Sequence, residues 1–438
     1  MREPESPVGD GVGLIRAIGP WALTALAINS IIGAGIFGLP ARIHALVGSY
    51  SVLVILLCAA LIGLIALCFA ELGSRFDRTG GPQLYATTAF GSVTGFTVGW
   101  LLWVSRIASL SAISNLLVDY GTVFWPQSAG PMGRTLIITS IIAAYTAINL
   151  CGVRQAAAVS TAFTISKLIP LLGFVAIGLG FSDLAVPLPA SLPSTADVST
   201  AVLLTSFAFF GFDAAAVVAG EVRDSRRSIP FAVLVSVGVV AVVYILVQLV
   251  CIAALPGLAA SERPLADAAA KLVGPWGATV MSIGAVVSSL GIIGVMLTAT
   301  PRALFALGEH RQLPAIFARV HPRFRTPHWA ITATSLMVLV LALSGTFIYL
   351  VKLAAIARIL VCAATCASLP IMRRRTDVPP PAFTVPAGPV IGWLCVALCL
   401  FFLAQSSMRE ILDVAVAAAI GLGIFWITRS ASAHRHKG

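Results

Sequence analysis

Hydrophobic residues run along this 438-residue chain in long blocks that are separated by short polar connections. Twelve blocks approach or exceed the roughly 20 apolar residues that a helix needs to cross a bilayer. The pattern predicts an all-α membrane protein with twelve transmembrane helices. We place the spans at residues 20–42, 49–72, 83–118, 134–151, 155–180, 200–220, 229–255, 275–307, 328–344, 346–371, 386–405 and 410–428.

The composition agrees with this interpretation. Hydrophobic residues make up 58% of the chain and charged residues 10%, whereas soluble domains carry about 25% charged residues. The net charge of +11 argues against nucleic-acid binding because of where the basic residues lie. Alternate short connections and the two ends of the chain hold most of them, which is typical of cytoplasmic segments. Those in the connections are Arg75, Arg78, Arg154, Arg223, Arg226, Arg227, Arg311, Arg319, Arg323, Arg325, Arg373, Arg374 and Arg375.

This distribution predicts a multi-pass protein of the cytoplasmic (inner) membrane with both termini inside the cell. The first nineteen residues lack the apolar core and cleavage site of a signal peptide. We therefore expect the first span to remain as an uncleaved anchor. The lipid bilayer is the first expected partner, and the short connections leave no room for a separate folded domain.

The run from Gly33 to Gly38 interrupts the first span with three glycines in six residues. Glycine is a poor helix former, so a break is expected here, and a break inside a bilayer must face protein or a watery cavity. The letters also fit the dinucleotide-binding pattern G-x-G-x-x-G. That interpretation fails because no short strand precedes the run and the next acid is Glu71, well beyond the expected spacing of about 20 residues.

A second interruption is expected in span 6, where Gly211 and Asp213 follow Phe207 and Phe210. Paired interruptions in two halves of a chain indicate a transport site. The alternative is that these glycines only pack helices, as we expect for Gly91, Gly95 and Gly99 in span 3.

Spans 1 and 6 would each open a unit of five helices, and an odd number gives the two units opposite orientations. The expected division is a tail over 1–19, a first repeat over 20–180, a second repeat over 200–371, two further helices over 386–428 and a tail over 429–438.

Four ionisable residues lie deep in the predicted spans, where charges are costly and are candidates for function: Arg106, Lys167, Asp213 and Arg358. Lys167 could take the place of a bound cation, and Ser288 and Ser289 lie at a similar depth. Asp213 could gate, carry a proton, or pair with either arginine, and purely structural ion pairing stays open. Lys352 lies nearer the outer surface and is expected to snorkel.

Neither a metal nor a cofactor is expected. The eight cysteines lie in or at the ends of apolar spans without a C-x-x-C pair, which argues against a disulfide framework or a zinc site. Cys362 and Cys366 share a helix face, as do Cys395 and Cys399, but buried free thiols are the simpler interpretation.

Three motifs carry a resemblance to a known family. Ile31–Phe37 resembles the first-helix signature of the amino acid–polyamine–organocation superfamily. Gly211–Asp213 with Gly220–Pro230 is similar to its sixth helix and following loop. Pro301-Arg302, Leu313-Pro314 and Phe324–Pro327 resemble the pattern after its eighth helix. The correspondence runs from about residue 18 to about residue 330.

The resemblance implies a LeuT-type inverted repeat of five plus five helices, with discontinuous helices 1 and 6 and two added helices. It implies alternating-access transport of amino acids or related amines. The substrate carboxylate would meet the amides from Gly33 to Ile36, and the amino group would meet carbonyls near Ile32 and Phe210. The implied substrate-binding residues are Ile32, Gly33, Ala34, Gly35, Ile36, Phe207, Phe210 and Gly211.

The resemblance also gives roles to two of the deep charges. Asp213 matches a gate position, and Lys167 matches a lysine that occupies the sodium place in sodium-independent members. Arg106 and Arg358 are not part of the family pattern. The candidate coupling and gating residues are Lys167, Asp213, Ser288, Ser289, Arg106 and Arg358.

The sequence therefore predicts a sodium-independent amino acid permease, working as a proton-linked symporter or an exchanger. Alternatives are a polyamine or other amine carrier, and a transporter-like sensor that binds ligand without flux. A membrane enzyme would need a cluster of histidine, cysteine or carboxylate groups at the membrane surface, which the loops do not show. The excess of deep positive charge favours neutral or acidic amino acids over arginine, lysine and polyamines.

Overall fold

The computed structural model describes residues 18–76, 80–151, 156–181 and 191–435, and most of these residues are helical. A single parallel bridge joins Ile18 to Val222 within the described ranges. The α-helices are α1 (Pro20–Ile31), α2 (Ala34–Val47), α3 (Ser51–Gly73), α4 (Pro82–Phe90), α5 (Ser92–Gly121), α6 (Pro131–Cys151), α7 (Ala156–Phe181), α8 (Thr195–Phe209), α9 (Ala214–Val217), α10 (Ser225–Ala254), α11 (Pro264–Val273), α12 (Pro275–Glu309), α13 (His328–Ser344), α14 (Phe347–Arg374), α15 (Gly388–Ala404) and α16 (Met408–Arg435).

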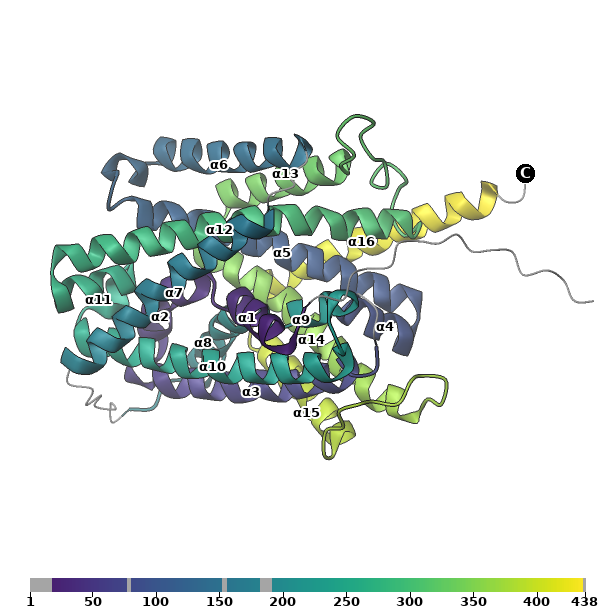
Figure 1. Ribbon diagram of the computed structural model, residues 1–438, viewed down its shortest axis with the longest axis horizontal. Coiled ribbons are helices and arrows are strands. Elements are labelled where there is room, and N and C mark those ends of the chain that lie inside the picture. Colours follow the sequence, from purple (N-terminus) through teal and green to yellow (C-terminus); the bar gives the residue numbers. More distant parts are fainter. Residues whose placement is uncertain (1–17, 77–79, 152–155, 182–190, 436–438) are drawn as a thin grey trace, which may run out of the picture.

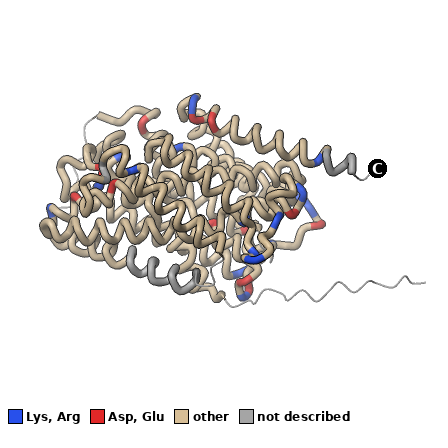
Figure 2. The backbone as a smooth tube through the Cα atoms, turned by 90° about the horizontal axis from the view of Figure 1, so that it is seen from above, with Lys and Arg blue, Asp and Glu red and all other residues tan. Residues whose placement is uncertain are grey.

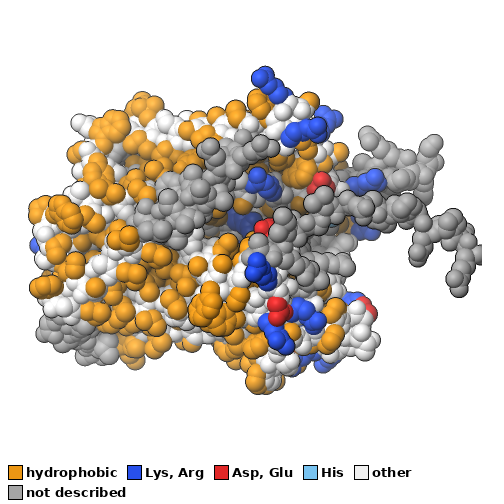
Figure 3. All heavy atoms as spheres, in the orientation of Figure 1, with side chains coloured by type: hydrophobic (Ala, Val, Ile, Leu, Met, Phe, Trp, Pro, Cys, Tyr) orange, Lys and Arg blue, Asp and Glu red, His pale blue; other side chains and the backbone are white. Residues whose placement is uncertain are grey.

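The long helices run along the longest axis of the molecule (Figure 1), and most charged residues lie toward its two ends (Figure 2). Hydrophobic side chains cover much of the flank between those ends (Figure 3). Leu336, Val340 and Ile420 are each more than half exposed, which suits lipid rather than water. Among the described residues, seven helices are long and apolar enough to cross a membrane. The protein is therefore an all-α, multi-pass membrane protein.

Two of the apolar blocks divide at the expected glycines. The first block separates into α1 and α2, with Ile32 and Gly33 in extended conformations between them. The sixth block separates into α8 and the short α9, with Phe210 extended and Gly211 at a φ of +127°. α2 packs against α8, and α1 packs against α9. The two interruptions therefore lie together in the fold.

The single span expected over residues 83–118 was wrong. α4 ends just before Gly91 and α5 begins just after it. Gly91 has a φ of +92°, which glycine adopts readily and which strains other residues. Gly91 therefore makes a bend and does not pack two helices. Gly95 and Gly99 do allow close packing of α4 on α5. A Cβ on Gly95 would lie 1.9 Å from Thr87 Oγ1.

Helices α5, α12 and α14 surround the two interruptions. α5 packs along both α12 and α14, and α14 also contacts α8. This arrangement brings Arg106 of α5, Arg358 of α14 and Asp213, which directly precedes α9, to one place in the interior.

Candidate functional site

The first interruption presents the amino end of a helix to the interior. α1 ends at Ile31, and α2 begins at Ala34 and continues for 14 residues. The first amides of an α-helix have no acceptor within the helix, and this end carries partial positive charge. Gly33, Ala34 and Gly35 supply these amides without bulky side chains. This arrangement can bind an anionic group.

The second interruption packs directly onto the first. A Cβ on Gly211 would lie 2.3 Å from the carbonyl oxygen of Ser30, and a Cβ on Gly35 would lie 2.8 Å from Ala208 Cα. Only glycine permits either approach without displacing backbone. The conformations of the two interruptions therefore depend on each other.

Tyr244 of α10 holds both interruptions and was not identified from the sequence. Its hydroxyl lies 2.9 Å from the carbonyl oxygen of Ala208 and 3.1 Å from that of Ile31. The side chain is 1% exposed, and it packs edge-on against Phe209. A tyrosine inside an apolar span needs a hydrogen-bond partner, so its position in the predicted span 229–255 was a signal that could have identified it.

A cavity of about 220 Å³ lies between the interruptions and the helices that surround them. Apolar groups with a few convergent polar ones line it, as in small-molecule sites. Ten of the predicted site residues line it: Gly33, Ala34, Gly35, Arg106, Phe207, Phe210, Gly211, Asp213, Ser288 and Arg358.

Three predicted residues are buried nearby without lining the cavity: Ile32, Ile36 and Ser289. Lys167 belongs to α7, but its side chain lies outside the part of the chain that the structure describes. Lining residues that the sequence did not single out include Asn29, Ser30, Ser109 and Thr300. They follow from the helical periodicity of α1, α5 and α12 once the facing sides are known.

Arg358 is the arginine that pairs with Asp213. Its Nη1 donates to Asp213 Oδ2 over 3.0 Å, and its Cζ lies 5.5 Å from the centre of the Phe210 ring. Asp213 is 5% exposed and Arg358 is 9% exposed. Arg106 lines the same cavity and has no ion-pair or hydrogen-bond partner among the described residues. Each arginine therefore has a different electrostatic state.

Further polar atoms in the cavity lining lack partners within the described structure. The hydroxyls of Ser288 and Thr300 and the Nε of Arg358 are buried without a hydrogen bond. Buried polar groups in proteins are almost always hydrogen-bonded, so unpaired ones that line a cavity are available to bind a polar ligand.

Lys352 lies elsewhere, near the start of α14. Its Nζ is 3.0 Å from Glu410 Oε1 on α16, and it does not line the cavity.

Three cysteines from separate helices come together, a grouping that sequence spacing did not reveal. Cys68 of α3, Cys366 of α14 and Cys395 of α15 are buried, and their sulfur atoms lie within 4.8 Å of one another. Short-range motifs such as C-x-x-C detect ligands on one segment only, and here each helix contributes one thiol.

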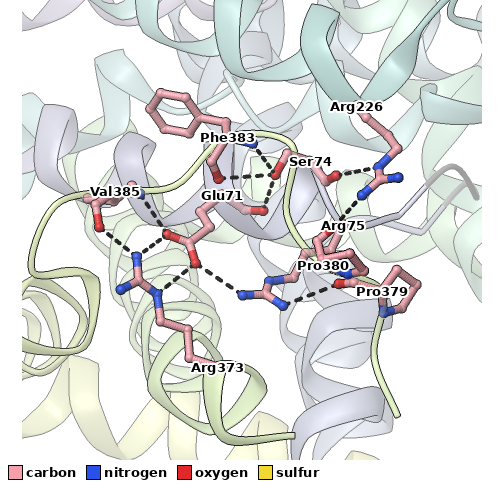
Figure 4. Close-up of polar contacts among 9 residues, drawn as sticks. All are labelled: Glu71, Ser74, Arg75, Arg226, Arg373, Pro379, Pro380, Phe383 and Val385. Atoms are coloured by element: carbon pink, nitrogen blue, oxygen red, sulfur yellow. Dashed lines mark hydrogen bonds and ion pairs between the residues drawn. The ribbon is translucent and has the colours of Figure 1, made fainter. Parts of the chain in front are cut away.

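Glu71 is the centre of a polar cluster at one end of α3, shown in Figure 4. Its carboxylate has no exposed surface. It accepts from Arg373 Nε at 2.8 Å, from Arg75 Nη2 at 3.2 Å and from the Val385 amide at 2.8 Å. These contacts attach the end of α14 and the connection to α15 onto α3.

Ser74 and Arg226 extend this cluster to α10. Ser74 Oγ accepts from the Phe383 amide at 3.1 Å, and Arg226 Nε donates to the Ser74 carbonyl at 2.9 Å. Arg226 also donates to the carbonyl of Pro380. The sequence showed these arginines only as positive charge in connections, whereas the structure gives them specific acceptors (Figure 4).

The sequence matches a family described as amino acid permease over residues 18–423. The chain belongs to the amino acid permease family. Its resemblance to the amino acid–polyamine–organocation superfamily is thereby confirmed. An uncharacterised transporter of Mycobacterium tuberculosis is 30% identical to this permease over 78% of the chain and 77% of the relative.

Relatives with named substrates match the permease over nearly their whole length. A serine/threonine exchanger of Bacillus subtilis is 27% identical over 94% of this chain and 95% of its own. A branched-chain amino acid permease of the same organism is 26% identical over 94% and 93%. These relatives are transporters and not enzymes, which supports membrane transport of amino acids as the general activity.

Proposed function

We propose that this permease carries amino acids across the cytoplasmic membrane by alternating access, with the substrate bound between the interruptions of α1–α2 and α8–α9. The observation that carries the proposal is the shared cavity. Two interrupted helices meet there, and the start of α2 and the unpaired hydroxyls of Ser288 and Thr300 line a space of about 220 Å³.

In this proposal the α-carboxylate of the substrate binds the amides of Gly33, Ala34, Gly35 and Ile36 at the positive end of α2. The α-amino group binds carbonyls near Ile32 and Phe210. Phe207 covers the bound molecule from the cavity wall. The close approach of Gly211 to Ser30 supports this arrangement, because a backbone movement at one interruption would displace the backbone of the other.

The proposal includes twelve transmembrane helices in a LeuT-type arrangement. The repeats would cover residues 20–180 and 200–371, helices over 386–428 would be added to them, and both termini would be cytoplasmic. An interrupted helix near the start of each half supports this division.

We further propose that transport is independent of sodium, because Lys167 would supply the positive charge that a sodium ion supplies in related folds. Transport would then be coupled to protons or proceed as exchange. Asp213 is the one acid in the described cavity lining, so its pairing with Arg358 is the proposed gate.

The test is uptake of labelled amino acids by the purified protein in liposomes. Uptake with and without sodium, a pH gradient and internal amino acid separates the coupling modes. The Gly35→Leu variant tests the proposed site, since its side chain would meet Ala208 and block the amides. Binding without flux would indicate a sensor, and competition by putrescine but not by amino acids would indicate an amine carrier.

A further inference from the structure

The cavity between the interruptions holds more positive than negative charge. Its charged lining residues, within the described structure, are Arg106, Asp213 and Arg358. Arg358 and Asp213 form an ion pair of 3.0 Å, so their charges largely cancel at a distance. Arg106 is within electrostatic reach of both members and pairs with neither. One guanidinium therefore faces the cavity without a counter-charge among the described side chains.

An unmatched charge inside a membrane protein is costly and calls for an explanation. The arginine here is far from the ends of α5, which extends from Ser92 to Gly121, so its side chain cannot reach either surface. A static partner is absent from the described residues, and the side chain borders the space where the substrate is proposed to bind. A mobile anion that enters the cavity would supply the missing charge.

The chemistry of the group identifies the anion. A guanidinium offers five N–H donors in a planar fork that fits two oxygens of a carboxylate, sulfonate or phosphate. The unpaired hydroxyls of Ser288 and Thr300 line the same cavity and can donate to such oxygens. The acid in the described lining, Asp213, is already engaged by Arg358.

We propose that the substrate is an amino acid whose side chain ends in a second anionic group, and that Arg106 binds this group. The inference rests on the proposed function, in which the α-carboxylate binds at the start of α2. Because the start of α2 binds the α-carboxylate, Arg106 remains available for a second anionic group. Arg358 cannot take this role without releasing Asp213 and leaving the face of Phe210.

The test measures binding, without requiring transport. Affinities of aspartate, glutamate, cysteate and phosphoserine are compared with those of asparagine and glutamine by calorimetry on the purified full-length protein. We expect the anionic amino acids to bind more tightly than the neutral amides. The ranking among carboxylate, sulfonate and phosphate ends shows which of them the fork accepts.

The variant Arg106→Met shows whether Arg106 binds the side-chain anion of the substrate or its α-carboxylate. If Arg106 binds the side chain, its loss weakens binding of the preferred anionic amino acid by about a hundredfold, the effect of truncating one partner of a buried charge pair. The neutral amides then bind as well as before or better. An equal loss for all amino acids would show that Arg106 binds the α-carboxylate, and would overturn the inference. Arg409→Met, at an exposed position on α16, is the control and should leave every affinity unchanged.

Thermal unfolding provides a second measurement, which distinguishes an arginine that binds a ligand from one that stabilises the fold. Because Arg106→Met removes an unmatched charge, the ligand-free variant should unfold at the native temperature or above it. A lowered unfolding temperature would reveal a partner that holds Arg106 in the fold and would contradict the inference. Flux of neutral amino acids alone would refute the inference and leave the proposed function standing. Failure of the native protein to bind any amino acid would refute both.

Discussion

Asp213 and Arg358 show at the residue scale how much depends on packing. The sequence indicated that either Arg106 or Arg358 could pair with Asp213, because all three residues lie deep in predicted spans. The structure selects Arg358, on α14, at 3.0 Å. The choice depends on how α5 and α14 are rotated about their axes, and no local pattern determines that rotation.

The pair gives a first prediction. Arg358→Met leaves a carboxylate that is 5% exposed without its partner, so the protein should lose about 3 kcal/mol of stability. Thermal unfolding of the purified protein measures this loss. The double variant with Asp213→Asn should recover much of it, because both charges are then gone. Equal stability of the single variant and the native protein would mean that water in the cavity already solvates Asp213.

Gly211 gives a second prediction at this scale. Gly211→Ala must hold a φ of +127° and place a Cβ 2.3 Å from the Ser30 carbonyl oxygen, so the interruption should shift and stability should fall by about 1–3 kcal/mol. Gly33→Ala is the control, since its Cβ would meet Ile292 Cδ1 at an ordinary 3.5 Å. Chemical unfolding compares the two. A similar loss in both would contradict the dependence on a close approach at Gly211.

At the scale of elements, hydropathy located most helices closely. The block 328–344 coincides with α13, and the break in the first block falls between α1 and α2. It failed at Gly91, because an apolar block shows no gap where a helix bends inside it. It also passed over α11, a ten-residue helix that is too short to form a span. The glycine runs were informative only where charge or several glycines marked a break.

The Glu71 cluster gives a prediction about how elements are held together. Glu71→Gln keeps the shape of the side chain but removes the charge that Arg373 and Arg75 share, so we expect about 3 kcal/mol of destabilisation. The connection between α14 and α15 should exchange amide hydrogens faster, since the Val385 amide loses a charged acceptor.

Asp377→Asn is the matched control for that experiment. Asp377 lies in the same connection and pairs with Arg375, but their side chains are 63% and 39% exposed. An exposed pair contributes little, so the control should change stability by less than about 1 kcal/mol. Hydrogen exchange that rises equally in both variants would show that Glu71 does not hold the connection.

At the scale of the whole molecule, composition and charge distribution predicted a multi-pass helical membrane protein, and its family membership is now established. Contacts between distant segments could not be predicted in this way. Cys68, Cys366 and Cys395 are separated by up to 327 positions in the chain and meet only because α3, α14 and α15 pack side by side. Tyr244 likewise reaches Ile31 across 213 positions. Such contacts arise from helix packing, which hydrophobic blocks alone do not specify.

The proposed orientation in the membrane can be tested with a native thiol. Cys151, at the end of α6, is exposed, whereas the other seven cysteines are buried. The neighbouring Leu150 carbonyl accepts from Thr326, in the connection that contains Arg319, Arg323 and Arg325, so Cys151 should lie on the cytoplasmic side. A membrane-impermeant maleimide should label it in inverted vesicles and not in intact cells.

The opposite face of the protein supplies the control for this labelling. Lys271→Cys, made together with Cys151→Ser, places an exposed thiol in the last turn of α11, which the proposed topology puts outside. This variant should be labelled in intact cells. The two labelling patterns should be opposite. In the proposed topology, the segment between residues 151 and 271 crosses the membrane an odd number of times. Labelling of Cys151 from the outside would reverse the whole topology, and with it the assignment of the arginine-rich connections and both termini to the cytoplasm.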